Sequence, residues 1–156
     1  MRIVISFIFF LFALPVTATP SEGALAGGII LGEPTGLSAK SYVTPTQAFD
    51  AALSYSLRTD SVWIHSDYLY HSESLSKSVP GGRWVPYGGL GGVLYISKNK
   101  EKQSSRALIA ARLPGGLMFY PTKSSFEFFA EIGLIVGLLP ATEVSMSGGI
   151  GSRYLF

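Results

Sequence analysis

Residues 125–138 read SFEFFAEIGLIVGL and alternate in character with a period of two. Every second side chain from Phe126 to Leu138 is apolar, whereas Glu127 and Glu131 belong to the other series. Successive side chains of a β-strand point to opposite faces, so a strand here has one continuous apolar face and one face that carries charge. A helix would instead surround both glutamates with aromatic rings. The pattern therefore predicts a long β-strand whose apolar face must be covered.

Turn-forming residues divide the rest of the chain into segments of the same kind. Residues 48–57, AFDAALSYSL, alternate as clearly as the first segment. Eight strands are predicted, at residues 24–32, 36–43, 48–57, 61–70, 84–97, 105–120, 125–138 and 144–156. Pro114 lies inside the sixth segment, where the loss of a ladder hydrogen bond predicts a bulge or bend at residues 114–116.

The N-terminus has the pattern of a secretory signal peptide. Arg2 provides a positive start, residues 3–14 are an apolar run, and Val16 and Ala18 fit the two small positions before a cleavage site. A retained transmembrane helix would need roughly 20 apolar residues, more than this run contains. We expect cleavage after Ala18, which assigns residues 1–18 to the signal and residues 19–156 to one domain.

The composition of the mature chain narrows the fold class. Charged residues make up 14% of the sequence, against about 25% in globular domains, with 18 glycines and no cysteine. Removal of Arg2 with the signal lowers the formal net charge from +2 to +1, so no nucleic-acid partner is expected. These features predict an all-β fold, an eight-stranded antiparallel up-and-down transmembrane β-barrel. Because lipid cannot bond to an open sheet edge, residues 144–156 should pair with 24–32.

Strand phase assigns one set of charged side chains to the lumen. The set is Lys40, Asp50, Asp67, Arg106, Arg112, Glu127, Glu131 and Arg153. Side chains fill the interior of a barrel this small, and unpaired buried charges are costly. We therefore expect the four basic and four acidic groups to pair across the lumen, with Arg153 opposite the acidic groups of residues 125–138. A narrow ion path or a proton-linked site is the alternative role for the same charges.

Aromatic residues concentrate near the ends of the predicted strands. They are Tyr42, Trp63, Tyr68, Tyr70, Trp84, Tyr87, Phe119, Tyr120 and Tyr154. This distribution is typical of the two aromatic girdles of a membrane barrel. A soluble periplasmic β-protein with an aromatic core is the alternative, but the sequence offers no second layer to cover the apolar faces.

The segment WIHSDYLYHSES contains both histidines and raises two chemical alternatives. A lipid-modifying hydrolase needs a histidine within hydrogen-bond reach of its nucleophile. In a strand, however, His65 and Ser66 point to opposite faces, as do His71 and Ser72. A metal site through His65, Asp67 and His71 is disfavoured because His71 lies far from the other two residues along the strand. We predict no catalytic residue, metal or cofactor, and the hydrolase stays an alternative.

Five motifs, GGIILGEPTGLSAKSYV, SDYLYH, PYGGLGG, FEFFAEIGLIVGLLPATE and GGIGSRYLF, cover much of the mature chain. They resemble a family of small, largely uncharacterised bacterial outer-membrane β-barrels, similar to the eight-stranded transmembrane domain of outer membrane protein A. The resemblance implies an outer membrane of the Gram-negative type, contact with its lipid and lipopolysaccharide, and recognition of the last strand by the barrel assembly machinery. It assigns Ile150, Tyr154 and Phe156 to that assembly signal, while Gly148 and Ser152 depart from the pattern.

The expected function is a structural or surface-interaction role without catalysis, carried out by a monomer. The connections raise one conflict with this expectation. If both termini are periplasmic, the outward connections EPT, RTD, KNKEKQS and LPATE are short, and the longest connection, residues 71–83, faces the periplasm. Outer-membrane barrels normally have the reverse arrangement. Either the fourth strand extends past Tyr70 or the strand count is wrong.

Overall fold

The computed structural model describes residues 20–99, 104–140 and 142–156, so the expected signal peptide lies outside the described residues. The strands are β1 (Leu25–Glu33), β2 (Thr35–Thr44), β3 (Gln47–Ser56), β4 (Ser61–His71), β5 (Lys77–Val79), β6 (Gly82–Asn99), β7 (Ser104–Pro121), β8 (Phe126–Leu139) and β9 (Val144–Leu155), with a short 3₁₀ helix, η1 (Glu73–Leu75), before β5. None of the helices in these segments is long and apolar enough to cross a membrane.

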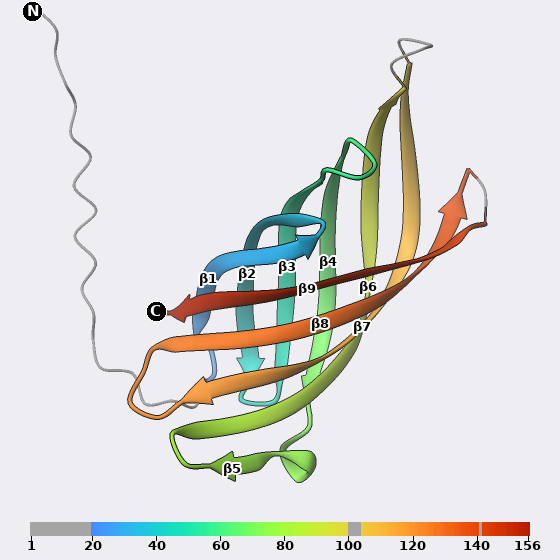
Figure 1. Ribbon diagram of the computed structural model, residues 1–156. Coiled ribbons are helices and arrows are strands. Elements are labelled where there is room, and N and C mark those ends of the chain that lie inside the picture. The colour runs from blue at the N-terminus through green and yellow to red at the C-terminus, as the bar shows by residue number, and fades with distance from the viewer. Residues whose placement is uncertain (1–19, 100–103, 141) are drawn as a thin grey trace, which may run out of the picture.

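Within the described residues, the eight strands β1–β4 and β6–β9 close into an antiparallel barrel (Figure 1). The predicted pairing of the last strand with the first is present, with Ala26 opposite Leu155 and Glu33 opposite Gly148. Strand β4 pairs directly with β6, which leaves the three-residue β5 outside the ring of eight strands. The predicted eight-stranded up-and-down fold is confirmed, and each predicted strand end lies within two residues of its observed position.

The two ends of the barrel differ. The terminal end holds Phe156, the first described residues and the β2–β3, β4–β6 and β7–β8 connections; the opposite end holds the other four connections. The 71–83 connection, predicted as the longest, lies at the terminal end as expected, but it is not an unstructured loop. This segment contains η1 and then β5, which pairs with the start of β6 from Lys77 opposite Trp84 to Val79 opposite Gly82. The β6 edge beyond the end of β4 is free to pair, so the segment becomes a short hairpin.

Strands β6 and β7 are each 18 residues long and form a hairpin that projects beyond its neighbours at the opposite end (Figure 1). A bulge or bend was predicted at 114–116, and no bulge is present there. Pairing of β6 with β7 instead lapses between Gly88–Gly115 and Gly91–Arg112 and resumes in the same register. Pro114 has no N–H to donate, so the ladder is interrupted without an extra residue.

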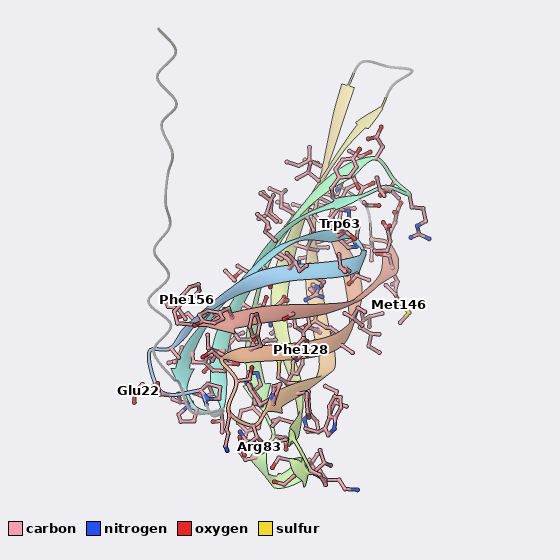
Figure 2. All side chains as sticks on the ribbon, turned by 60° about the vertical axis from the view of Figure 1, so that its left-hand side comes forward. Glu22, Trp63, Arg83, Phe128, Met146 and Phe156 are labelled. Atoms are coloured by element: carbon pink, nitrogen blue, oxygen red, sulfur yellow. The ribbon has the colours of Figure 1, made fainter. Side chains whose placement is uncertain are left out.

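The barrel exterior is apolar and the charged side chains of the spanning strands point inward. On β8, Phe126, Phe128, Ile132 and Leu134 are exposed, while Glu127 and Glu131 are buried. Figure 2 shows Met146 and Phe156 standing out from the two ends of β9. This arrangement matches a barrel surrounded by hydrocarbon, where the apolar side chains face lipid.

The prediction that all nine aromatic residues form girdles is wrong for three of them. Tyr42, Tyr87 and Tyr120 are buried in the lumen. Outward aromatic pairs are present near the terminal end, where Phe49 packs on Tyr68 and Trp84 on Phe119. The three inward tyrosines have hydroxyl partners in the lumen, as described next.

Candidate functional site

The predicted lumen charges come from six strands that face one another across the barrel. Lys40 (β2), Asp50 (β3), Asp67 (β4), Arg112 (β7), Glu127 and Glu131 (β8), and Arg153 (β9) are all buried. Arg106 belongs to β7, but its side chain lies outside the described side chains. Lys40 is directly opposite Asp50, and Asp50 is directly opposite Asp67 in the ladder. Two carboxylates are therefore adjacent, and each needs a cation from the far wall.

Glu127 lies at the centre of the lower cluster, toward the terminal end. Its Oε1 lies 3.4 Å from Lys40 Nζ and accepts a hydrogen bond from Arg153 Nη1 at 3.0 Å. Its Oε2 accepts the Tyr42 hydroxyl at 2.5 Å. Tyr42 also contacts the Tyr120 hydroxyl at 2.9 Å. Both oxygens of this fully buried carboxylate are satisfied, as a charge removed from water requires.

Arg153 joins three walls of the barrel. It is directly opposite Glu127 on β8, donates to the carboxylate of Asp50 on β3, and donates from Nε to Ser38 Oγ on β2 at 2.8 Å. Its guanidinium carbon lies 4.0 Å from the centre of the Phe129 ring, within range of a cation–π contact. The planar donor fork of arginine suits this role, because one side chain can bond several acceptors at once.

Arg112 makes a second cluster nearer the opposite end. It donates to the carboxylate of Asp67 and, from Nη2, to Glu131 Oε1 at 2.5 Å. The other oxygen of Glu131 accepts the Tyr87 hydroxyl at 2.8 Å. Gly91, opposite Asp67 on β6, leaves the room for that carboxylate, because an added Cβ would overlap it. In the two clusters together, each of the four carboxylates lies beside a lysine or an arginine.

The lumen tyrosines are the members of this network that sequence reasoning missed, and His71, which shares the strand parity of Asp67, also belongs to it. His71 Nε2 lies 3.3 Å from Lys40 Nζ and Nδ1 lies 3.2 Å from the Thr46 carbonyl. These partners fit a neutral imidazole whose Nδ1–H donates to the Thr46 carbonyl and whose Nε2 accepts from Lys40. Tyr42 shares the strand parity of Lys40, two residues away, and that parity was the available signal.

His65 does not form the arrangement that a hydrolase needs. Its imidazole is buried, with Nε2 4.0 Å from Asp50 Oδ1 and 3.8 Å from Asp67 Oδ2, whereas the neighbouring Ser66 is exposed on the outer face. His71 is held by Lys40 and Thr46. In the described part of the chain, no group of three or more histidine or acidic side chains is arranged to hold a metal ion.

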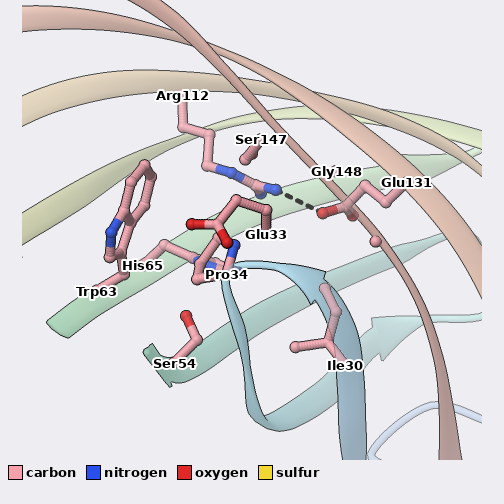
Figure 3. A pocket seen from close by; sticks show the side chains of 11 residues that line it. Ile30, Glu33, Pro34, Ser54, Trp63, His65, Arg112, Glu131, Ser147 and Gly148 are labelled. Carbon is pink, nitrogen blue, oxygen red and sulfur yellow. Dashed lines mark hydrogen bonds and ion pairs between the residues drawn. The ribbon is translucent and has the colours of Figure 1, made fainter. Parts of the chain in front are cut away.

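A small pocket opens above the Arg112 cluster, toward the opposite end (Figure 3). Glu33 and Pro34 border it at the end of β1, and His65, Arg112 and Glu131 line its floor and walls. Glu33 also accepts a hydrogen bond from Ser56. The cavity volume open to the centre of a water molecule is about 10 Å³, so it is far too small for an organic substrate.

The last strand presents its apolar series to the outside. Ile150 and Phe156 are exposed, and Tyr154 is partly exposed between them. The Tyr154 ring packs edge-on against Phe126 and Phe156, with ring centres 5.3 and 5.2 Å apart. The backbone N–H of Phe156 donates to the Leu25 carbonyl, so the final residue is tied to the first strand.

Comparison with solved structures identifies the fold. The N-terminal β-barrel domain of OprF from Pseudomonas aeruginosa superposes with a TM-score of 0.66 at 17% identity, over 88% of this chain and 100% of that domain. The chain has the fold of the OprF barrel domain. A de novo designed transmembrane β-barrel also matches, with a TM-score of 0.55 at 14% identity, over 88% of this chain and 99% of the design. The expected resemblance to the outer membrane protein A barrel is confirmed for the fold, since the OprF barrel is of that type.

No protein-family model matches the chain, and no curated protein matches it. At identities below 20%, the likeness to OprF and to the design concerns the arrangement of the backbone. Any role for the lumen residues must therefore be argued from this chain.

Proposed function

We propose that the protein is a monomeric outer-membrane β-barrel with a structural or surface-interaction role and no catalytic activity. The observation that carries this proposal is the division of the barrel wall into an apolar exterior and an interior of paired charges. Such a wall is stable in hydrocarbon and unsuited to water. The OprF-like fold and the predicted signal peptide agree with an outer-membrane location.

The last strand supports a further part of this proposal, recognition by the barrel assembly machinery. Ile150, Tyr154 and Phe156 lie on one outward face of β9, where another protein can reach them before the barrel enters lipid. The remaining exterior would contact outer-membrane lipid and lipopolysaccharide. Apart from the projecting β6–β7 hairpin, the connections at the opposite end are short and leave little surface for a large soluble partner.

The closed lumen is the main argument against the pore alternative. Toward the terminal end, Tyr42, Leu69, Val85 and Met118 fill the interior with exposed fractions of 1% or less. The hydrolase alternative lacks support as well, because in the described residues neither histidine hydrogen-bonds a serine hydroxyl.

Three measurements test the proposal. Membrane fractionation should place the protein with the outer membrane, and gel migration should change on heating, because a folded barrel runs differently from the unfolded chain. Planar bilayers that contain the purified protein should show the conductance of an empty membrane. Recovery in the soluble periplasmic fraction would refute the membrane location, and single-channel steps would refute the closed lumen.

A further inference from the structure

The pocket above Arg112 contains a buried polar atom without a protein partner. Ser54 lies on the pocket wall with an exposed fraction of 4%, and its hydroxyl makes no hydrogen bond to the protein. Ser147, on the facing strand β9, also lines the pocket with an unpartnered buried hydroxyl. Figure 3 shows the Ser54 hydroxyl pointing toward Glu33 and the pocket interior. Buried hydroxyl groups of this kind are normally satisfied by ordered water, and the cavity has room for about one molecule.

The pocket rim carries a negative charge. Glu33 borders the pocket entrance, apart from the carboxylates of the two clusters, each of which already lies beside a lysine or arginine. A carboxylate at the entrance favours cations there and disfavours anions.

The distances around His65 allow a bridging water molecule. Its Nε2 is 3.8 and 4.0 Å from oxygens of Asp67 and Asp50, too far for direct hydrogen bonds but suitable for a bridging water. Asp67 Oδ1 is itself buried without a partner. A water molecule that bridges these groups from the pocket side would therefore satisfy Asp67 Oδ1.

The pocket does not continue past the level of His65 and Arg112. Below it, Arg112 is tied to Asp67 and Glu131, and Arg153 to Asp50. Beyond these pairs, the terminal end is filled by the fully buried aromatic and aliphatic side chains named above.

We propose that this pocket is a one-sided hydrated vestibule, which admits water and small monovalent cations from the opposite end as far as His65 and Arg112. It ends inside the barrel and is not a pore. The inference concerns access to the lumen and does not depend on the surface role proposed above.

Single cysteines test this inference in a chain that has none of its own. Ag⁺ is a small monovalent cation that bonds to the sulfur of a cysteine and releases the thiol proton. The test variant is Ser54→Cys. Ala48→Cys is the buried control at the terminal end, and Leu57→Cys, 85% exposed at the opposite end, is the accessible control. Each folded barrel is exposed to Ag⁺ or to an anionic thiosulfonate, then unfolded, and the remaining free thiol is counted.

We expect both reagents to modify Leu57→Cys, only Ag⁺ to modify Ser54→Cys rapidly, and neither to modify Ala48→Cys rapidly. Protection of Ser54→Cys equal to that of Ala48→Cys would show a sealed lumen and overturn the proposal. Equally rapid reaction of Ala48→Cys would show a continuous passage and overturn the one-sided vestibule. Ser147→Cys repeats the test if Ser54→Cys loses the heat-dependent gel shift.

The cation preference has its own matched pair of variants. In the Ser54→Cys background, Glu33→Gln removes the charge at the pocket rim, and Glu143→Gln removes the same charge from an exposed position at the same end. At low salt, Glu33→Gln should slow the Ag⁺ reaction about fivefold, the effect of one charge at close range in water. Glu143→Gln should have a much smaller effect. Equal effects would refute the role of Glu33 in attracting cations.

Discussion

Arg153→Met tests the buried network most directly. The substitution leaves an unbranched side chain against Phe129 but removes the guanidinium that bonds Asp50 and Glu127. Breaking a buried ion pair by removing one partner costs about 3–5 kcal/mol, because the other charge stays buried and unpaired. Lys40 stays 3.4 Å from Glu127 and partly compensates that carboxylate. We therefore expect a loss near the lower limit, about 3 kcal/mol.

The assay is urea unfolding of the barrel refolded into lipid vesicles, followed by the fluorescence of Trp63 and Trp84. The matched control is Arg58→Met, the same substitution at an exposed arginine outside the lumen. A surface change of this kind should alter the free energy of unfolding by no more than about 0.5 kcal/mol. A loss below about 1 kcal/mol for Arg153→Met would match an ordinary surface pair and refute the reasoning.

A double variant separates lost pairing from lost packing. Asp50→Asn in the Arg153→Met background removes the carboxylate left unpaired, so it should restore part of the lost free energy. The two substitutions should therefore cost less together than the sum of their separate costs, as expected for residues in one network. Strictly additive costs would show that Arg153 and Asp50 do not act as a pair.

Three further substitutions probe other parts of the barrel. Gly91→Ala should abolish the heat-dependent gel shift, because the new Cβ would overlap the carboxylate opposite, whereas Gly115→Ala meets nothing within 4 Å and should retain it. Tyr42→Phe removes the hydrogen bond to Glu127 and should cost about 1.5–3 kcal/mol in the same urea titration; no measurable loss would contradict the 2.5 Å contact. Ile132→Arg places a charge on the lipid-facing side of β8 and should cost about 2–4 kcal/mol, unless that face does not contact hydrocarbon.

The fold could be predicted because each spanning strand repeats one physical requirement. A wall between lipid and a filled lumen forces alternation, and alternation fixes which face of each strand is buried. Glu127 and Glu131 were assigned to the lumen in this way, and both are buried. Turn-forming residues predicted the strand ends closely, since turns in a barrel this small are short.

The wrong predictions share a different cause. Residues 71–83 contain serines, glycines and a proline, so locally they resemble a loop. Residues 77–79 nevertheless form β5, because the edge of β6 offers a partner. Tyr42 and Tyr87 lie near strand ends, which suggested girdles, but the lumen carboxylates require hydroxyl donors. The pairing of a given base with a given acid depends on contacts across the barrel, which strand phase alone does not specify.

The network also constrains how the barrel can assemble. Arg153 meets Asp50 across 103 residues of sequence and Ser38 across 115, so these bonds exist only when β9 has joined β1. An open sheet would carry one face of unsatisfied charge along its whole width, together with two unpaired edges. Neither is tolerated in hydrocarbon. Ring closure and entry into lipid must therefore be a single cooperative event, and a chain halted before its last strand would have no stable place in the membrane.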